Sequence, residues 1–221
     1  VAASVSGTLA LSFGLIDIGN YNLTITSSGS ISGGSVTSYV KTSGTGRLKQ
    51  TVPGMGGSKI YPVGNSAYNP MTVTYNDISA SKNFSIRVAD GTITNANSSK
   101  TVNRKWYLAA DAAGSSDLTL SATYNAGEEG SGFSNSSSPQ IGYFDGTSWA
   151  YRPISSGSGT TTFTASGSAP DFSNTSGFFA LGSDDAFNAS KLAVTNLNPN
   201  NPTQDLATTQ IFVQSQNSNS V

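Results

Sequence analysis

The sequence predicts an all-β fold, a β-sandwich preceded by a small β-solenoid-like or stacked-hairpin region, with almost no helix. Apolar and polar residues alternate along many short segments, which is typical of strands that bury one face. Clusters of Gly, Asn and Ser separate these segments, and such clusters favour turns. No stretch has the 3.6-residue period of a helix. With 36% apolar residues, nine Tyr and ten Phe, the chain can bury a core.

Residues 1–78 consist of short alternating segments at close spacing. Leu9, Leu11 and Phe13 alternate with small or polar residues, and Leu23 and Ile25 alternate with threonines. Close spacing of short strands is typical of a β-solenoid or of stacked hairpins. We therefore expect a solenoid-like N-terminal region over 1–78.

Residues 79–186 contain longer alternating segments, which predict a β-sandwich. The expected strands are 84–88, 100–109, 117–124, 140–145, 160–165 and 177–182. Trp106 lies between Lys105 and Tyr107, and alternation places it on the face opposite to both. We expect Trp106 to lie in the sandwich core.

Residues 187–221 predict a linker and a strand pair, with strands over 191–197 and 209–216. The link between them contains Pro199 and Pro202. An isolated strand pair is marginally stable in water, so we expect this segment to pack on another subunit or module.

Composition excludes several classes of function. Eleven basic and twelve acidic residues are scattered and give a net charge of −1, which disfavours a nucleic-acid partner. No run of apolar residues is long enough to insert in a membrane. Low charge with many Gly, Ser and Thr is common in bacterial surface fibres, and we expect an extracellular location. The start at Val1 indicates a processed chain or a fragment.

The chain has no Cys and no His, which excludes disulfides, thiol nucleophiles and imidazole catalysis. Glu128 and Glu129 are the only adjacent glutamates, and paired carboxylates can hydrolyse glycosides. Neighbouring strand residues point to opposite faces, however, so a solvated turn is expected here. The prediction is a protein that is not an enzyme, with no catalytic residue and no cofactor.

The remaining residues offer two candidate binding sites, one for calcium and one for a sugar. Asp184 and Asp185, with Asp171 nearby, have the oxygen ligands that calcium prefers but lack the acidic density of a dedicated loop. No metal site is predicted, and calcium binding stays open. A sugar-stacking platform is the second candidate, since alternation places two of its three aromatic residues on one face. The platform would consist of Tyr143, Trp149 and Tyr151. The same alternation is typical of aromatic residues in a core, so core packing is the favoured interpretation of these rings.

Four motifs carry a family resemblance: Ser38–Lys41, Gly46–Pro53, Ile60–Gly64 and Tyr68–Val73. Together they resemble the SYVxGxLxR…FPVGxxxYxPVTLT repeat region of large secreted surface proteins of the Bacteroidota, including gliding and adhesin-type proteins exported by the type IX system. Tyr61 stands where that pattern has Phe. The similarity covers residues 1–186, and the tail resembles the first strands of bacterial immunoglobulin-like repeats. The resemblance implies export, a cell-surface location and an adhesive or architectural role, without catalytic residues.

The function expected from the sequence is that of a structural subunit or repeat module of an extracellular bacterial fibre, sheath or surface array. It would assemble head-to-tail by β-strand addition, with itself or with neighbouring modules as partner. The alternative is a carbohydrate-binding adhesin domain, with surface glycans as partner. The expected assembly interface consists of Leu9, Leu11, Phe13, Leu192, Val194, Leu197, Ile211 and Val213.

Overall fold

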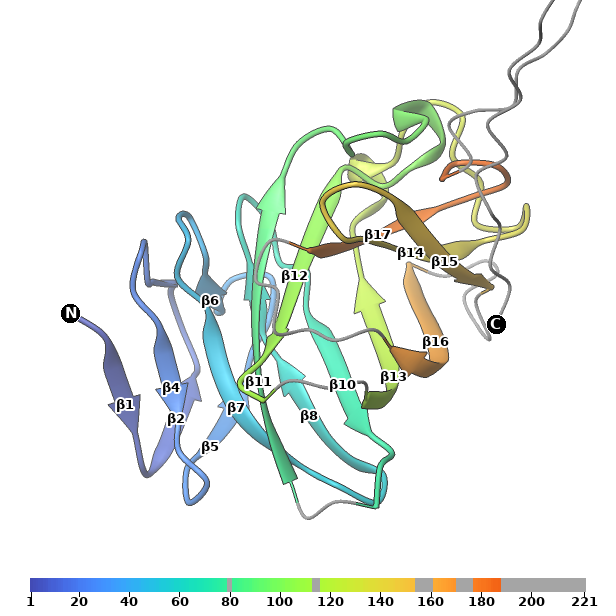
Figure 1. Cartoon of the computed structure of the whole chain (residues 1–221). Helices are drawn as coiled ribbons and strands as arrows, with labels where there is room; N and C mark the ends of the chain where they lie inside the picture. The colour runs from blue at the N-terminus through green and yellow to red at the C-terminus, as the bar shows by residue number, and fades with distance from the viewer. Residues whose placement is uncertain (79–80, 113–115, 154–160, 170–176, 188–221) are drawn as a thin grey trace, which may run out of the picture.

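The computed structural model describes residues 1–78, 81–112, 116–153, 161–169 and 177–187. Within these ranges the chain is built from strands, and its helical elements are the two 3₁₀ turns η1 (Ser98–Lys100) and η2 (Ala126–Glu128) (Figure 1). The all-β prediction is confirmed. The described part contains no helix with the length and apolar character needed to cross a bilayer.

The N-terminal strands wind into a parallel β-solenoid rather than stacked hairpins. The first coil consists of β1 (Ala3–Val5), β2 (Thr8–Leu11) and β3 (Ile16–Asp17). The second coil consists of β4 (Leu23–Ile25), β5 (Ser30–Gly33) and β6 (Val40–Lys41). The third coil begins with β7 (Leu48–Pro53) and returns at β9 (Val63–Gly64). All pairings between coils are parallel: β1–β4–β7, β2–β5 and β3–β6–β9.

Inward side chains of successive coils stack in register, because each parallel pair aligns residues of the same orientation. Ile16 lies opposite Val40, which lies opposite Val63, and Leu23 lies opposite Leu48. Burial increases along this stack: Ile16 is exposed, whereas Val40 and Val63 are fully buried. Each coil is therefore covered by the next one along the chain.

Two packed sheets form the sandwich that follows. The larger sheet has the order β1-β4-β7-β11-β12-β17-β14-β15, and the smaller has the order β16-β13-β10-β8. In the larger sheet the further strands are β11 (Ser81–Asp90), β12 (Arg104–Ala110), β17 (Phe178–Gly182), β14 (Gln140–Phe144) and β15 (Trp149–Pro153). The smaller sheet contains β8 (Gly57–Tyr61), β10 (Met71–Tyr75), β13 (Ser116–Thr123) and β16 (Thr162–Ala169).

Strand β7 belongs to both architectures. It pairs in parallel with β4 of the solenoid and antiparallel with β11 of the sandwich. Strands β8 and β10 also lie in the sandwich although they precede residue 78. One continuous hydrophobic core extends from Leu11 and Leu23 to Leu181. The expected regions 1–78 and 79–186 thus share a sheet and a core, and the change of architecture comes before residue 78.

Trp106 lies at the centre of this core, as expected. Its side chain is 0% exposed, and its indole Nε1 donates a hydrogen bond to the carbonyl oxygen of Asn69 at 3.0 Å. Buried residues from both sheets belong to the same cluster, since inward residues alternate with outward polar residues along each strand. This cluster includes Leu48, Met71, Phe84, Ile86, Leu108, Leu118 and Phe163.

Candidate functional site: the open first coil

The first coil is an edge in each of the three sheets that pass through the solenoid. Strand β1 ends the eight-stranded sheet, β2 pairs with β5 alone, and β3 ends a three-stranded sheet. Figure 1 shows β1 and β2 beside the N-terminus, at the opposite end of the molecule from β14 and β15. Among the described residues, no strand covers the outer side of this coil. Three parallel edges therefore lie together at one end of the fold.

Backbone hydrogen bonds show which groups of the first coil are already used. In β2 the carbonyls of Gly7 and Leu11 accept from Ser30 and Gly34, at 3.0 and 3.3 Å. Alternate residues of a parallel strand bond to the same neighbour, so the N–H and C=O of Ala10 point the other way. The same argument turns the backbone groups of Ser4 in β1 outward. These groups are available for a further parallel strand.

Nothing in the sequence of β1 and β2, two of the three edge strands, opposes strand pairing. The first charged residue of the chain is Asp17, so β1 and β2 carry no charge and no Pro. Natural edge strands are usually blunted by charged residues, Pro or bulges. Strand β15, at the far edge of the same sheet, ends with Arg152 and Pro153. The contrast marks the first coil as a surface suited to pairing.

The three N-terminal residues of the expected interface take different places. Leu9 packs partly buried against the core and Leu11 is 5% exposed, so both point into the solenoid. Phe13 does not continue this strand, because β2 ends at Leu11 and the chain turns at Gly14, whose φ is +82°. Its side chain is 94% exposed on the corner of the coil.

Sequence reasoning missed the other inward residues of this coil, Val5 and Ile18, which pack against the core. The available signal was the register of about 20 to 25 residues that links Ala3 to Leu23 and Leu23 to Leu48, a length typical of solenoid repeats. The other expected interface residues are Leu192, Val194, Leu197, Ile211 and Val213. They lie outside the described residues.

The structure does not bring the expected sugar platform together. Tyr143 is 6% exposed and packs on Phe179, with 5.0 Å between ring centroids, so its ring is not available for stacking. Trp149 lies on the other face of the hairpin, where its ring centroid is 4.4 Å from that of Phe187. Its indole nitrogen donates to the carbonyl of Thr94 at 3.1 Å. The side chain of Tyr151 is outside the described part.

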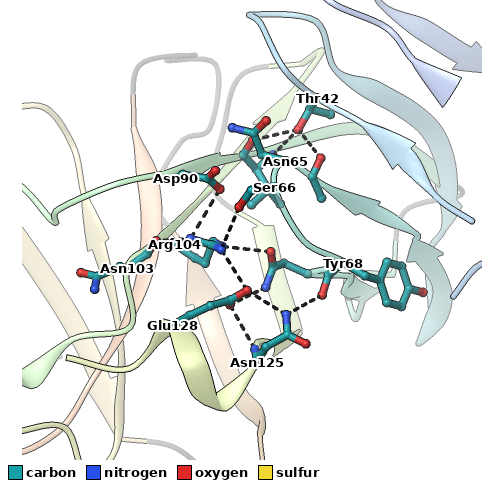
Figure 2. Close-up of polar contacts among 12 residues, drawn as sticks. Thr42, Asn65, Ser66, Tyr68, Asp90, Asn103, Arg104, Asn125 and Glu128 are labelled. Atoms are coloured by element: carbon teal, nitrogen blue, oxygen red, sulfur yellow. Dashed lines mark hydrogen bonds and ion pairs between the residues drawn. The ribbon is translucent and has the colours of Figure 1, made fainter. Parts of the chain in front are cut away.

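The solvated turn expected at Glu128 is wrong. Glu128 is 7% exposed, and its Oε1 accepts from Arg104 Nη2 at 3.0 Å (Figure 2). Its Oε2 accepts from Asn69 Nδ2 at 2.6 Å and from the backbone of Asn125 at 3.0 Å. The capping box between Asn125 and Glu128 folds the carboxylate inward, toward an arginine 24 residues earlier that local turn chemistry cannot reveal.

This buried network links separate parts of the fold. Arg104 also lies 3.4 Å from Asp90 Oδ1, and it donates to Asn69 and Ser66 in the turn before β10 (Figure 2). Both oxygens of Glu128 are occupied by donors, so the carboxylate acts as a structural acceptor. Glu129 has a different environment and accepts from the Tyr124 hydroxyl at 2.9 Å. The two carboxylates thus do not form a pair that faces one ligand.

The aspartates considered for calcium do not gather into a cage. Asp184 lies 3.7 Å from Lys100 Nζ and accepts from Ser137. Asp185 is exposed, and Asp171 lies outside the described residues. No cluster of three or more potential metal ligands occurs in the part of the chain that the structure describes.

Comparison of the chain with protein-family models, with curated proteins and with solved structures finds no match.

Proposed function

We propose that this chain is a structural, non-enzymatic module of an extracellular bacterial surface assembly, and that it is extended by parallel strand addition at its first coil. The open edge of three strands, of which β1 and β2 carry no charged side chain, is the observation that supports this proposal. A further coil would pair with the outward backbone groups of β1 and β2. It would also cover the exposed apolar side chains of Leu15 and Ile16.

The proposed occupant is residues 188–221 of a second copy. This segment is longer than one coil of about 20 to 25 residues, and its charged residues are Lys191 and Asp205. The segment therefore has few charged residues, as does the edge that it would meet. The apolar residues that would enter the solenoid are Leu192, Val194, Leu197, Ile211 and Val213.

The positions of acceptor and donor favour a head-to-tail contact. Phe187, which precedes the tail, packs on Trp149 of β15 at one end of the eight-stranded sheet, whereas β1 forms the other end. A tail that leaves beside β15 reaches the first coil of the next molecule more directly than its own. Because the two surfaces differ, the contact is heterologous and propagates into a filament unless its rotation closes a ring.

A complementation experiment tests this proposal. Ala10→Pro removes an outward N–H from the acceptor edge and leaves the β2–β5 hydrogen bonds intact. Deletion of 188–221 removes the donor. We expect the full chain to form concentration-dependent oligomers in sedimentation velocity and filaments in electron microscopy. Each variant alone should be a folded monomer, and the mixture of the two should form a 1:1 complex.

The matched control is Ala10→Thr, which keeps the N–H and favours a strand, and which should assemble like the unmodified chain. Tail donation is wrong if the deleted protein still polymerises, or if the mixture remains monomeric while both variants are folded by circular dichroism.

A further inference from the structure

A row of large side chains crosses the outward face of the eight-stranded sheet. Arg87 of β11 lies opposite Tyr107 of β12, and Phe144 of β14 lies opposite both Phe178 of β17 and Trp149 of β15. The rings of Tyr107 and Phe178 complete the row, with 5.4 Å between their centroids. The row thus passes from a cationic end at β11 to an aromatic end at β15.

Three basic groups meet at the cationic end. The guanidinium carbon of Arg87 lies 3.5 Å from the ring centroid of Tyr107, and that of Arg47 lies 5.8 Å from it. Lys105 Nζ lies 5.5 Å from the ring centroid of Phe178. Burial and the nearby Arg87 charge lower the pKa of Lys105, and the same two causes lower the pKa of Arg47 to about 10. Like charges are therefore held close together on this face.

The acidic residues nearby along these strands are engaged elsewhere. Asp111 pairs with Lys49, and Asp90 lies beside Arg104. Within the described ranges, no carboxylate forms an ion pair with Arg87 or Lys105. Only eleven basic residues occur in the whole chain, so the concentration of three of them around the adjacent rings of Tyr107 and Phe178 is a distinct feature of this face.

A polar groove of about 370 Å³ adjoins the cluster on the same sheet. Hydroxyl, amide and ammonium groups dominate its lining, which includes Thr24, Lys49, Thr51 and Asn83. Lys49 lies opposite Ser85, two residues before Arg87 along β11. The groove therefore presents hydroxyl, amide and ammonium groups on the same face of the sheet as Arg87.

We propose that this outward face binds an acidic polysaccharide, with a carboxylate or sulfate group between Arg87 and Lys105 and neighbouring sugar hydroxyls in the groove. Stacking on Tyr107 fixes the guanidinium plane of Arg87, whose edge N–H groups match the oxygens of such an anion. A bound anion also relieves the repulsion among the cations. A nucleic acid fits less well, because phosphate neutralisation needs a longer basic track.

This site differs from the sugar platform expected from the sequence, since it is centred on Arg87 and Lys105 rather than on Tyr143. It is also independent of strand addition, because side chains on a sheet face carry it and not a strand edge. The two proposals can therefore fail separately.

Isothermal titration of the full chain with polygalacturonate, a carboxylated polymer, tests the proposal. We expect binding to weaken at least tenfold in the double variant Arg87→Gln/Lys105→Gln. The matched control is Lys59→Gln on β8 of the other sheet, which removes one charge far from the row and should bind unchanged. Arg87→Lys keeps the charge but not the planar stack, and we expect it to lose part of the affinity.

Polymer controls separate specific recognition from charge attraction. The fully methyl-esterified polymer, which lacks the carboxylates, should not bind, and single-stranded DNA should bind at least tenfold more weakly than polygalacturonate. Equal binding of the double variant and the unmodified chain would overturn the proposal, as would equal binding of DNA. Circular dichroism melting curves confirm that each variant is folded before it is titrated.

Discussion

Arg104 and Glu128 form an ion pair inside the protein, with Nη2 and Oε1 3.0 Å apart and exposed fractions of 8% and 7%. Glu128→Gln should lower the free energy of unfolding by about 3 kcal/mol. The expected loss is at the lower end for a broken buried pair, because Asp90 remains beside Arg104. Denaturant unfolding followed by tryptophan fluorescence measures the change.

The matched control is Glu129→Gln, which keeps an oxygen to accept from Tyr124 and should change stability by less than about 1 kcal/mol. Equal effects of the two substitutions would contradict the structural role given to Glu128.

Trp106→Ala should destabilise the fold by roughly 3–5 kcal/mol, because a fully buried large aromatic side chain is removed from the centre of the core. Trp106→Phe retains most of the apolar volume but leaves the carbonyl of Asn69 without its indole donor. Its expected cost is about 1–3 kcal/mol. Thermal and denaturant melts of both variants check this order, and a larger loss for Phe than for Ala would disprove it.

The turn between β14 and β15 should stabilise the fold at neutral pH and lose this contribution at low pH. Hydrogen bonds from the backbone of Ser148 and Thr147 lower the pKa of Asp145 to about 2. They favour the charged carboxylate, so their contribution to the free energy of unfolding is present above the ordinary pKa of 3.8 and is lost as the pH falls through about 2.

Comparison of Asp145→Asn with the unmodified chain isolates this charge. The variant should be less stable at pH 6 by under about 1 kcal/mol, because solvent screens the turn. The difference should vanish near pH 2, where the aspartate becomes protonated. Melting temperatures at the two pH values test the prediction, and a difference that grows in acid would refute it.

Amide hydrogen exchange should be graded along the solenoid. Burial rises from the first coil to the third, so amides of β1 and β2 should exchange faster than those of β4, and those of β7 should exchange slowest. Assembly by strand addition should slow the outward amides of Ser4 and Ala10 selectively. Uniform exchange across the three coils, or no protection of these amides in assembled material, would count against the proposed edge.

Local alternation was enough to predict the all-β fold and the buried position of Trp106. These properties follow from residues adjacent in sequence, because a strand with one buried face shows a two-residue period. The parallel stacking of coils did not follow from alternation. It depends on the register between Ile16, Val40 and Val63, which are far apart in the chain.

The environment of Glu128 and the relative orientation of Tyr143 and Trp149 were not predictable for a related reason. A turn sequence such as that around Glu128 is compatible with solvent until Arg104 is placed beside it by a long-range contact. Tyr143 and Trp149 lie on strands of one hairpin, yet the register pairs Tyr143 with Ala150 and turns the two rings to opposite faces. A long-range contact decides the first case and the register between two strands decides the second.

The dual pairing of β7 has a mechanical consequence. Since β4 and β11 both bond to β7, the backbone ladder is continuous from β1 to β15, and tension along a filament would act across that ladder. Such tension would break the backbone hydrogen bonds between neighbouring strands one strand at a time. The first strands to separate would be those with the fewest buried contacts. The first coil would then separate from the second, while the sandwich around Trp106 stays folded. The contact between subunits could therefore form again once the force falls.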